Sequence, residues 1–245
     1  MAEKRFSIGD SIKFGWDTMK GNIGFFIVLI IVAALIENIP GAIGNFAKDF
    51  PMISFLLFFI GWLLGFIVQM GLIKVSLKFC DGTRGKLDDL LSSFDLLWKF
   101  ILSSITYGLI VFGGTLLLVV PGVIWAVKFS LFPYFLVDKG LGPIEAIKAS
   151  GEATKDTKMH LFLFGLTLGV LNIAGALVLL VGLFATIPTS MVAYAYVYRT
   201  LSGETESPEG AVPDSGGGPE ASPEKPPHEV PKTGGKGVMY INMEG

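Results

Sequence analysis

The sequence is poor in the residues that carry most metal and redox chemistry. It contains a single cysteine, Cys80, so an intramolecular disulfide is excluded. Its two histidines, His160 and His228, lie far apart, and no HExxH or CxxC spacing occurs, which argues against a zinc site. A phosphate-binding glycine loop and a nucleophile elbow are also missing. The sequence therefore predicts a protein that is not an enzyme and that needs no cofactor.

Charge is scarce as well, and apolar residues take its place. Charged residues make up 16% of the chain and hydrophobic residues 51%, with 20 phenylalanines among them. No basic patch alternates with aromatic residues in the way that nucleic-acid-binding surfaces require, so no nucleic-acid partner is expected. This composition predicts an all-α, polytopic membrane protein whose partners include membrane lipids.

Six apolar segments are long enough to cross a bilayer as helices, the conformation that pairs every backbone polar group within the segment. They lie at about 23–39, 51–73, 100–120, 122–138, 161–181 and 185–199. The first segment has a signal peptide as its alternative interpretation, but the leader would be unusually long, amphipathic and mixed in charge. We therefore expect a membrane domain over residues 1–200, built from three hairpins.

Proline and glycine are expected to end or bend these spans. Pro121 and Gly122 are predicted to form the turn between the third and fourth spans, because proline lacks an N–H and glycine tolerates unusual backbone angles. Pro40 is predicted to end the first span, and Pro133 to kink the fourth.

Each hairpin follows a segment whose apolar and charged residues fall on opposite faces of a helix. These segments lie at about 7–20, 86–98 and 143–157, and such helices lie on a membrane surface or against a partner. Eighteen of the 19 basic residues, all but Lys48, fall on the side of the two termini. The positive-inside rule therefore predicts that both termini are cytoplasmic and that the three amphipathic helices form a cytoplasmic collar.

The last segment, 201–245, has a different composition from the rest. It contains seven prolines and nine glycines and few apolar residues. Such a segment buries too little apolar surface to offset the entropy of ordering, so we expect a disordered tail. Its less polar end, from Val238 to Met243, is either a docking peptide for a protein partner or an idle terminus.

Lys128 is the charged residue that stands out within the predicted spans. It lies seven residues, or roughly 10 Å, inside the predicted outer turn, where a charged group costs a few kcal/mol. Its side chain either snorkels to the headgroups, or pairs with Glu37 or an anionic lipid headgroup. Asp138 is expected to be a solvated acid at a helix end.

Two stripes of small and amide residues run along predicted spans. The stripes comprise Gly61, Gly65 and Gln69 in the second span, and Gly165, Gly169 and Asn172 in the fifth. Small residues at such spacing allow two membrane helices to approach closely, so the glycines are predicted to pack against neighbouring helices. For Gln69, the alternative is that its amide lines a substrate path.

The stretch PGVIWAVKFSLFPYFLVDKGLGPIEAIKASGEATKD resembles the signature of a widespread set of uncharacterised prokaryotic multi-pass membrane proteins. That set is related to the membrane domain of glycerophosphoryl diester phosphodiesterases. The matching residues are Pro121, Gly122, Trp125, Lys128, Phe129, Pro133, Tyr134, Val137, Asp138, Pro143, Ala146 and Ser150. The resemblance implies a prokaryotic cytoplasmic-membrane location and no reaction, because this chain lacks the appended barrel and its His and Glu residues.

Two functions remain open from the sequence. The first is a non-enzymatic membrane scaffold that organises lipid or a protein partner through its cytoplasmic collar or tail. The alternative is a small transporter or channel with a polar path near Gln69, Lys128 and Asn172. The transporter requires these polar groups to converge on one cavity, whereas separate packing seams favour the scaffold.

Overall fold

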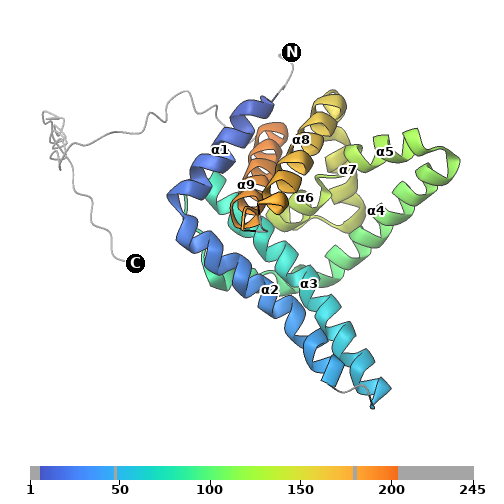
Figure 1. The fold of residues 1–245 in the computed structure, drawn as a ribbon. Helices are drawn as coiled ribbons and strands as arrows, with labels where there is room; N and C mark the ends of the chain where they lie inside the picture. The colour runs from blue at the N-terminus through green and yellow to red at the C-terminus, as the bar shows by residue number, and fades with distance from the viewer. Residues whose placement is uncertain (1–5, 47–48, 179–180, 204–245) are drawn as a thin grey trace, which may run out of the picture. The chain divides into compact units, whose positions relative to one another are not determined.

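The computed structural model describes residues 6–46, 49–178 and 181–203, all within one compact unit, Met1–Glu206. The described residues contain helices and turns but no β-strand, which confirms the all-α prediction (Figure 1). The elements are α1 (Ile8–Gly21), α2 (Ile23–Phe46), α3 (Pro51–Cys80), η1 (Leu87–Leu90), η2 (Phe94–Leu96), α4 (Leu97–Leu117), α5 (Val119–Lys128), α6 (Phe132–Lys139), α7 (Pro143–Ala153), α8 (Lys158–Leu177) and α9 (Leu183–Ser202). The predicted disordered tail lies outside the described residues from 204 onward.

The first hairpin pairs α2 with α3, and both helices are longer than the sequence predicts. Pro40 lies inside α2 and does not end it, so the helix runs on to Phe46. A Cβ placed on Gly61 of α3 would lie 3.5 Å from the Pro40 Cβ, so the proline ring is in van der Waals range of α3. α2 thus continues past Pro40, whose ring is buried against α3, even though proline removes one backbone hydrogen bond.

The second hairpin turns at a different residue from the one predicted. α4 ends at Leu117, Leu118 has extended backbone, and α5 begins at Val119. Pro121 and Gly122 therefore lie in the first turn of α5, where proline is tolerated because that N–H has no helical partner. A Cβ on Gly122 would lie 2.8 Å from the Thr115 Cα, so glycine lets the two helices meet closely at this end.

The predicted fourth span is two helices instead of one kinked helix. α5 ends at Lys128, and α6 starts at Phe132 with Pro133 in its first turn. The residues between them, from Phe129 to Leu131, form turns. Proline at the start of α6 fits its missing N–H, and the chain breaks before it.

The three segments predicted as amphipathic helices differ in structure. The segment 86–98 is not one helix but the two short 3₁₀ turns η1 and η2 followed by the start of α4. α7 ends at Ala153, before the predicted end at 157, and packs on α6 and α4. α1 packs along α9, because Gly15 brings its backbone against the Thr189 carbonyl oxygen and Ala193.

Five segments of the described chain are long and apolar enough to cross a membrane. They are Ile23–Phe46, Pro51–Cys80, Leu87–Leu117, Val119–Lys139 and Lys158–Leu177. The predicted sixth span, 185–199, corresponds to α9, which is long enough to cross a membrane but less apolar than these five segments. Figure 1 shows α9 between α1 and α8, and Thr186, Thr189 and Tyr198 of α9 are buried by neighbouring helices. The polar residues of α9 are thus accommodated by contacts with other helices, which fits its lower hydropathy.

Candidate functional site

The break between α5 and α6 is held by two hydroxyl groups of α7. The Ser150 Oγ accepts a hydrogen bond from the Leu131 N–H at 3.1 Å and donates to the Lys128 carbonyl oxygen at 3.2 Å. The Thr154 Oγ1 also donates to the Lys128 carbonyl oxygen, at 2.7 Å. A broken helix inside a membrane protein is tolerated only where its freed backbone groups find such partners. Ser150 and Thr154 are both fully buried, so they are structural partners of the break.

The Lys128 side chain lies beside this break. Its Nζ is 4.9 Å from the centroid of the Phe129 ring, and its Cε lies 3.2 Å from a Cβ placed on Gly151. Because Thr154 bonds to the Lys128 carbonyl, the polar turn that precedes α8 reaches the level of Lys128. Among the described residues, no hydrogen bond or ion pair joins Lys128 to Glu37.

An apolar groove of about 570 Å³ runs between α5 and α8. Its walls are Val119, Val120, Val123, Ile124 and Val127 of α5 with Lys158, Met159 and Phe162 of α8. Most of the wall residues are exposed, so the groove opens to the surface of the helices. Lys158 is the charged member of the lining and begins α8, where helix N–H groups also favour an anion.

Gln69 lines a smaller cavity of about 290 Å³ between α3, α6 and α9. Polar and aromatic side chains share the lining: Ser76, Ser130, Tyr134 and Tyr194, with Leu72, Ile73, Pro133 and Met191 completing it. Neither Lys128 nor Asn172 belongs to this lining. The amide predicted at a helix seam therefore faces a cavity, but without the other two polar groups.

Asn172 lies in the seam between α8 and α9. Its Nδ2 donates to the Ser190 Oγ at 2.9 Å and to the Leu168 carbonyl oxygen at 3.0 Å. On the same helix, a Cβ at Gly165 would lie 3.1 Å from the Tyr194 hydroxyl oxygen, whereas Gly169 has nothing within 4 Å. Asn172 and Gly165 are thus part of a packing contact, and Gly169 is open.

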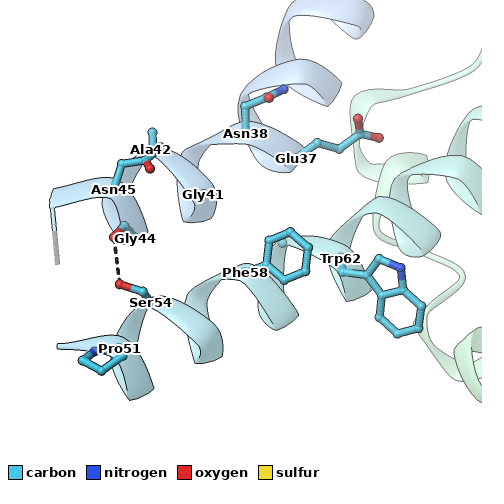
Figure 2. A pocket seen from close by; sticks show the side chains of 11 residues that line it. Glu37, Asn38, Gly41, Ala42, Gly44, Asn45, Pro51, Ser54, Phe58 and Trp62 are labelled. Carbon is cyan, nitrogen blue, oxygen red and sulfur yellow. Dashed lines mark hydrogen bonds between the residues drawn. The ribbon is translucent and has the colours of Figure 1, made fainter. Parts of the chain in front are cut away.

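Another groove lies within the first hairpin, between α2 and α3, as Figure 2 shows. It has a volume of about 830 Å³ and is lined by Glu37, Asn38, Gly41, Ala42, Gly44, Asn45, Pro51, Ser54, Phe58, Gly61 and Trp62. The Ser54 Oγ donates to the Gly44 carbonyl oxygen at 3.0 Å and closes the hairpin near its turn. Gly61 lies against α2, whereas Gly65 has nothing within 4 Å.

The register of this hairpin places Glu37 opposite the middle of the apolar stretch of α3. α3 carries no charged residue from Pro51 to Ile73, a length of roughly 35 Å at helical rise. The Glu37 carbonyl oxygen lies 3.5 Å from a Cβ placed on Gly61, which is ten residues, or roughly 15 Å, from the start of α3. An ionisable side chain in the middle of a membrane span is a candidate functional group, so Glu37 stays a candidate.

An ion-pair network that we did not expect from the sequence joins the ends of three helices. The Arg199 Nη1 lies 2.9 Å from the Asp138 Oδ2, and its Nη2 lies 2.7 Å from the Asp81 Oδ2. The Tyr198 hydroxyl also donates to Asp138, at 2.7 Å. Asp138, predicted to be solvated, therefore has a largely buried side chain that is paired with α9. The sequence did contain a signal for this network, because Asp81, Asp138 and Arg199 each lie at the end of an apolar segment.

Metal chemistry finds no support in the described part of the chain. Residues 6–46, 49–178 and 181–203 contain no group of three or more His, Cys, Asp or Glu side chains that could hold a metal ion.

Comparisons with known proteins give relatives but no activity. No protein-family model and no solved structure matches the chain. The chain is similar to the uncharacterized proteins Rv2560 of Mycobacterium tuberculosis and Mb2590 of Mycobacterium bovis. Each is 24% identical over 226 residues, which cover 81% of this chain and 69% of the relative. The resemblance to the phosphodiesterase-related membrane family therefore stays a prediction.

Proposed function

We propose that this chain is a non-enzymatic membrane protein that binds and organises anionic lipid through the groove between α5 and α8. In this proposal α9 is the sixth span, both termini are cytoplasmic, and the membrane is the cytoplasmic membrane of a prokaryote. The polar turns around η1 and α7 then form the cytoplasmic collar. The distribution of Lys and Arg supports that orientation.

The observation that carries the proposal is the pairing of an apolar groove with a lysine at its end. Five branched residues of α5 line one wall, which suits an acyl chain, and Lys158 lies where a phosphate would meet the start of α8. A basic residue near an anionic bilayer surface contributes about 1 kcal/mol to lipid attraction. The cytoplasmic leaflet, where the orientation places Lys158, carries that negative charge.

The second observation is the separation of the intramembrane polar groups. Lys128 lies at the α5–α6 break, Asn172 lies in the α8–α9 seam, and Gln69 faces its own cavity. A transport path would need these groups to share one water-filled cavity. Their separation supports the scaffold over the transporter.

Native mass spectrometry of the full chain tests the lipid proposal. The protein is purified in a mild detergent and titrated with phosphatidylglycerol or phosphatidylcholine. We expect retention of phosphatidylglycerol to fall about fivefold in Lys158→Met, in line with the loss of one basic contact. Lys148→Met, an exposed lysine on α7 outside the groove lining, is the matched control.

A second pair of variants tests the groove itself. Val123→Trp fills the groove and should lower retention of both lipids, whereas Leu109→Trp on the exposed face of α4 should not. If Lys158→Met and Val123→Trp both retain as much lipid as the wild type, the proposal is refuted.

The transporter remains the alternative because the cavity at Gln69 has a partly polar lining. Single cysteines at Ser130 and Met191, in a Cys80→Ser background, distinguish the two functions. A water-filled path predicts rapid reaction with a hydrophilic thiol reagent at both positions in membranes. The scaffold predicts slow reaction at both, because no water-filled path then leads to the cavity.

A further inference from the structure

A polar stripe runs along the surface of α2. Ala34, Asn38, Gly41 and Asn45 follow one another at spacings of four, three and four residues. This is the seam period of two helices that pack with a small left-handed crossing angle. Three of these residues are exposed and Gly41 is half-buried, and Asn38, Gly41 and Asn45 border the groove of the first hairpin, so the chain leaves the stripe open on that flank of α2. In Figure 2 the Asn38 side chain points away from α3.

The middle of the stripe, at Asn38, lies at a depth where polar groups need partners. Asn38 follows Glu37, which the register with Gly61 places roughly 15 Å from the start of α3. Hydrocarbon offers no hydrogen bonds, so an amide exposed there has lost the water that would satisfy it. Asn38 uses its Nδ2 to donate to the Ala34 carbonyl oxygen at 2.8 Å. Within the described residues its Oδ1 accepts no hydrogen bond, and the Asn45 amide has no partner.

No other helix of the described chain covers this part of the hairpin. α3 has no buried residue before Ile67, so its first half contacts little besides α2. Figure 1 shows the far end of the α2–α3 hairpin extending beyond the other helices. A Cβ on Gly41 would meet nothing within 4 Å, which leaves room for a neighbouring backbone.

We propose that the polar stripe of α2 is a homodimer interface, in which a second copy of this chain presents the same stripe about a two-fold axis. A carboxamide is both donor and acceptor, so two Asn38 side chains related by two-fold symmetry satisfy each other. Gly41 and Ala34 let the helix backbones approach closely, as small residues do at membrane helix interfaces. An acyl chain would leave the amide groups unpaired, and the stripe carries no charge that calls for an ionic partner.

Disulfide trapping in native membranes tests the interface. In a Cys80→Ser background, Ala34→Cys and Gly41→Cys place a thiol on the stripe. Ile39→Cys and Ile43→Cys place one at similar depth on another exposed face of α2 and serve as matched controls. We expect mild oxidation to trap a dimer of the full chain at positions 34 and 41, and little at 39 and 43.

A side-chain variant links the trapping to the amide. Asn38→Leu in the Ala34→Cys chain should reduce trapping about fivefold, the factor expected for one interhelical hydrogen bond in a membrane. Retained α-helical circular dichroism shows that each variant still folds. Equal trapping on both faces, no trapping at 34 and 41, or trapping to a different protein would each overturn the proposal.

Discussion

Replacing Ser150 by Ala should destabilise the fold without touching any exposed surface. The Ser150 hydroxyl is the hydrogen-bond partner of the Leu131 N–H, and Leu131 is fully buried. A buried donor left without a partner costs about 1–3 kcal/mol. The Lys128 carbonyl oxygen keeps its bond from Thr154, so only one backbone group is orphaned. We therefore expect Ser150→Ala to lower the free energy of unfolding by about 2 kcal/mol.

The neighbouring hydroxyl should matter less. In Thr154→Val the Lys128 carbonyl oxygen still accepts from Ser150, so the loss should stay near about 1 kcal/mol. Thr106→Ala is the matched control, because the exposed Thr106 hydroxyl donates only to the Leu102 carbonyl oxygen of its own helix. That variant should change stability by less than about 0.5 kcal/mol.

Reversible unfolding in mixed dodecylmaltoside and SDS micelles, followed by circular dichroism, measures these differences. If Ser150→Ala unfolds at the same SDS fraction as Thr106→Ala, the hydroxyl does not hold the break, and the account of the α5–α6 junction is wrong.

Two further substitutions test close contacts elsewhere in the fold by the same unfolding assay. Gly71→Ala should lower the free energy of unfolding by about 1–3 kcal/mol, because its Cβ would lie 2.6 Å from the backbone of Leu90 in η1. Gly65→Ala is the control and should have no such effect, because its Cβ would meet nothing within 4 Å. Equal effects of the two variants would contradict the contact between Gly71 and η1. Asp138→Asn should lower the free energy of unfolding by about 1–3 kcal/mol, because it weakens the largely buried ion pair with Arg199. Asp17→Asn, in an exposed pair with Lys20, should lower it by under about 0.5 kcal/mol. Similar losses in both variants would contradict the importance of burial for the Asp138 pair.

Hydropathy predicted the fold class, because hydrocarbon permits few structures besides helices. It could not predict the helix ends. The sequence predicted helix ends at Pro40 and Pro121, but the structure places both prolines inside helices. Pro40 packs against α3, and Pro121 lies in the first turn of α5, where proline is tolerated. Tertiary packing decided both positions, and one sequence does not reveal which helix will be adjacent.

The segment 86–98 shows how local bonding overrides periodicity. Its apolar residues repeat as in a helix, yet Asp89 accepts hydrogen bonds from the Lys86 N–H and from the Lys78 Nζ. These bonds fix a 3₁₀ turn against α3, where Gly71 leaves space for it. A helical projection contains no information about such a long-range partner.

The candidate site was predictable only in part. Charge and hydropathy identified four candidate polar residues, Lys128, Glu37, Gln69 and Asn172. They could not predict that these residues lie apart in the structure. The role of Ser150 was hidden, because it depends on the break between α5 and α6, which α6 separates from α7 in the chain.

Cysteine accessibility tests the central claim most directly, namely that the hairpins cross a membrane with their charged ends on one side. Single cysteines replace Asp49, Thr83 and Asp156 in the Cys80→Ser chain, and intact cells are treated with a membrane-impermeant maleimide. The account predicts labelling at Asp49 in intact cells, and at Thr83 and Asp156 only after the cells are permeabilised. Labelling of Thr83 or Asp156 from outside intact cells would contradict it.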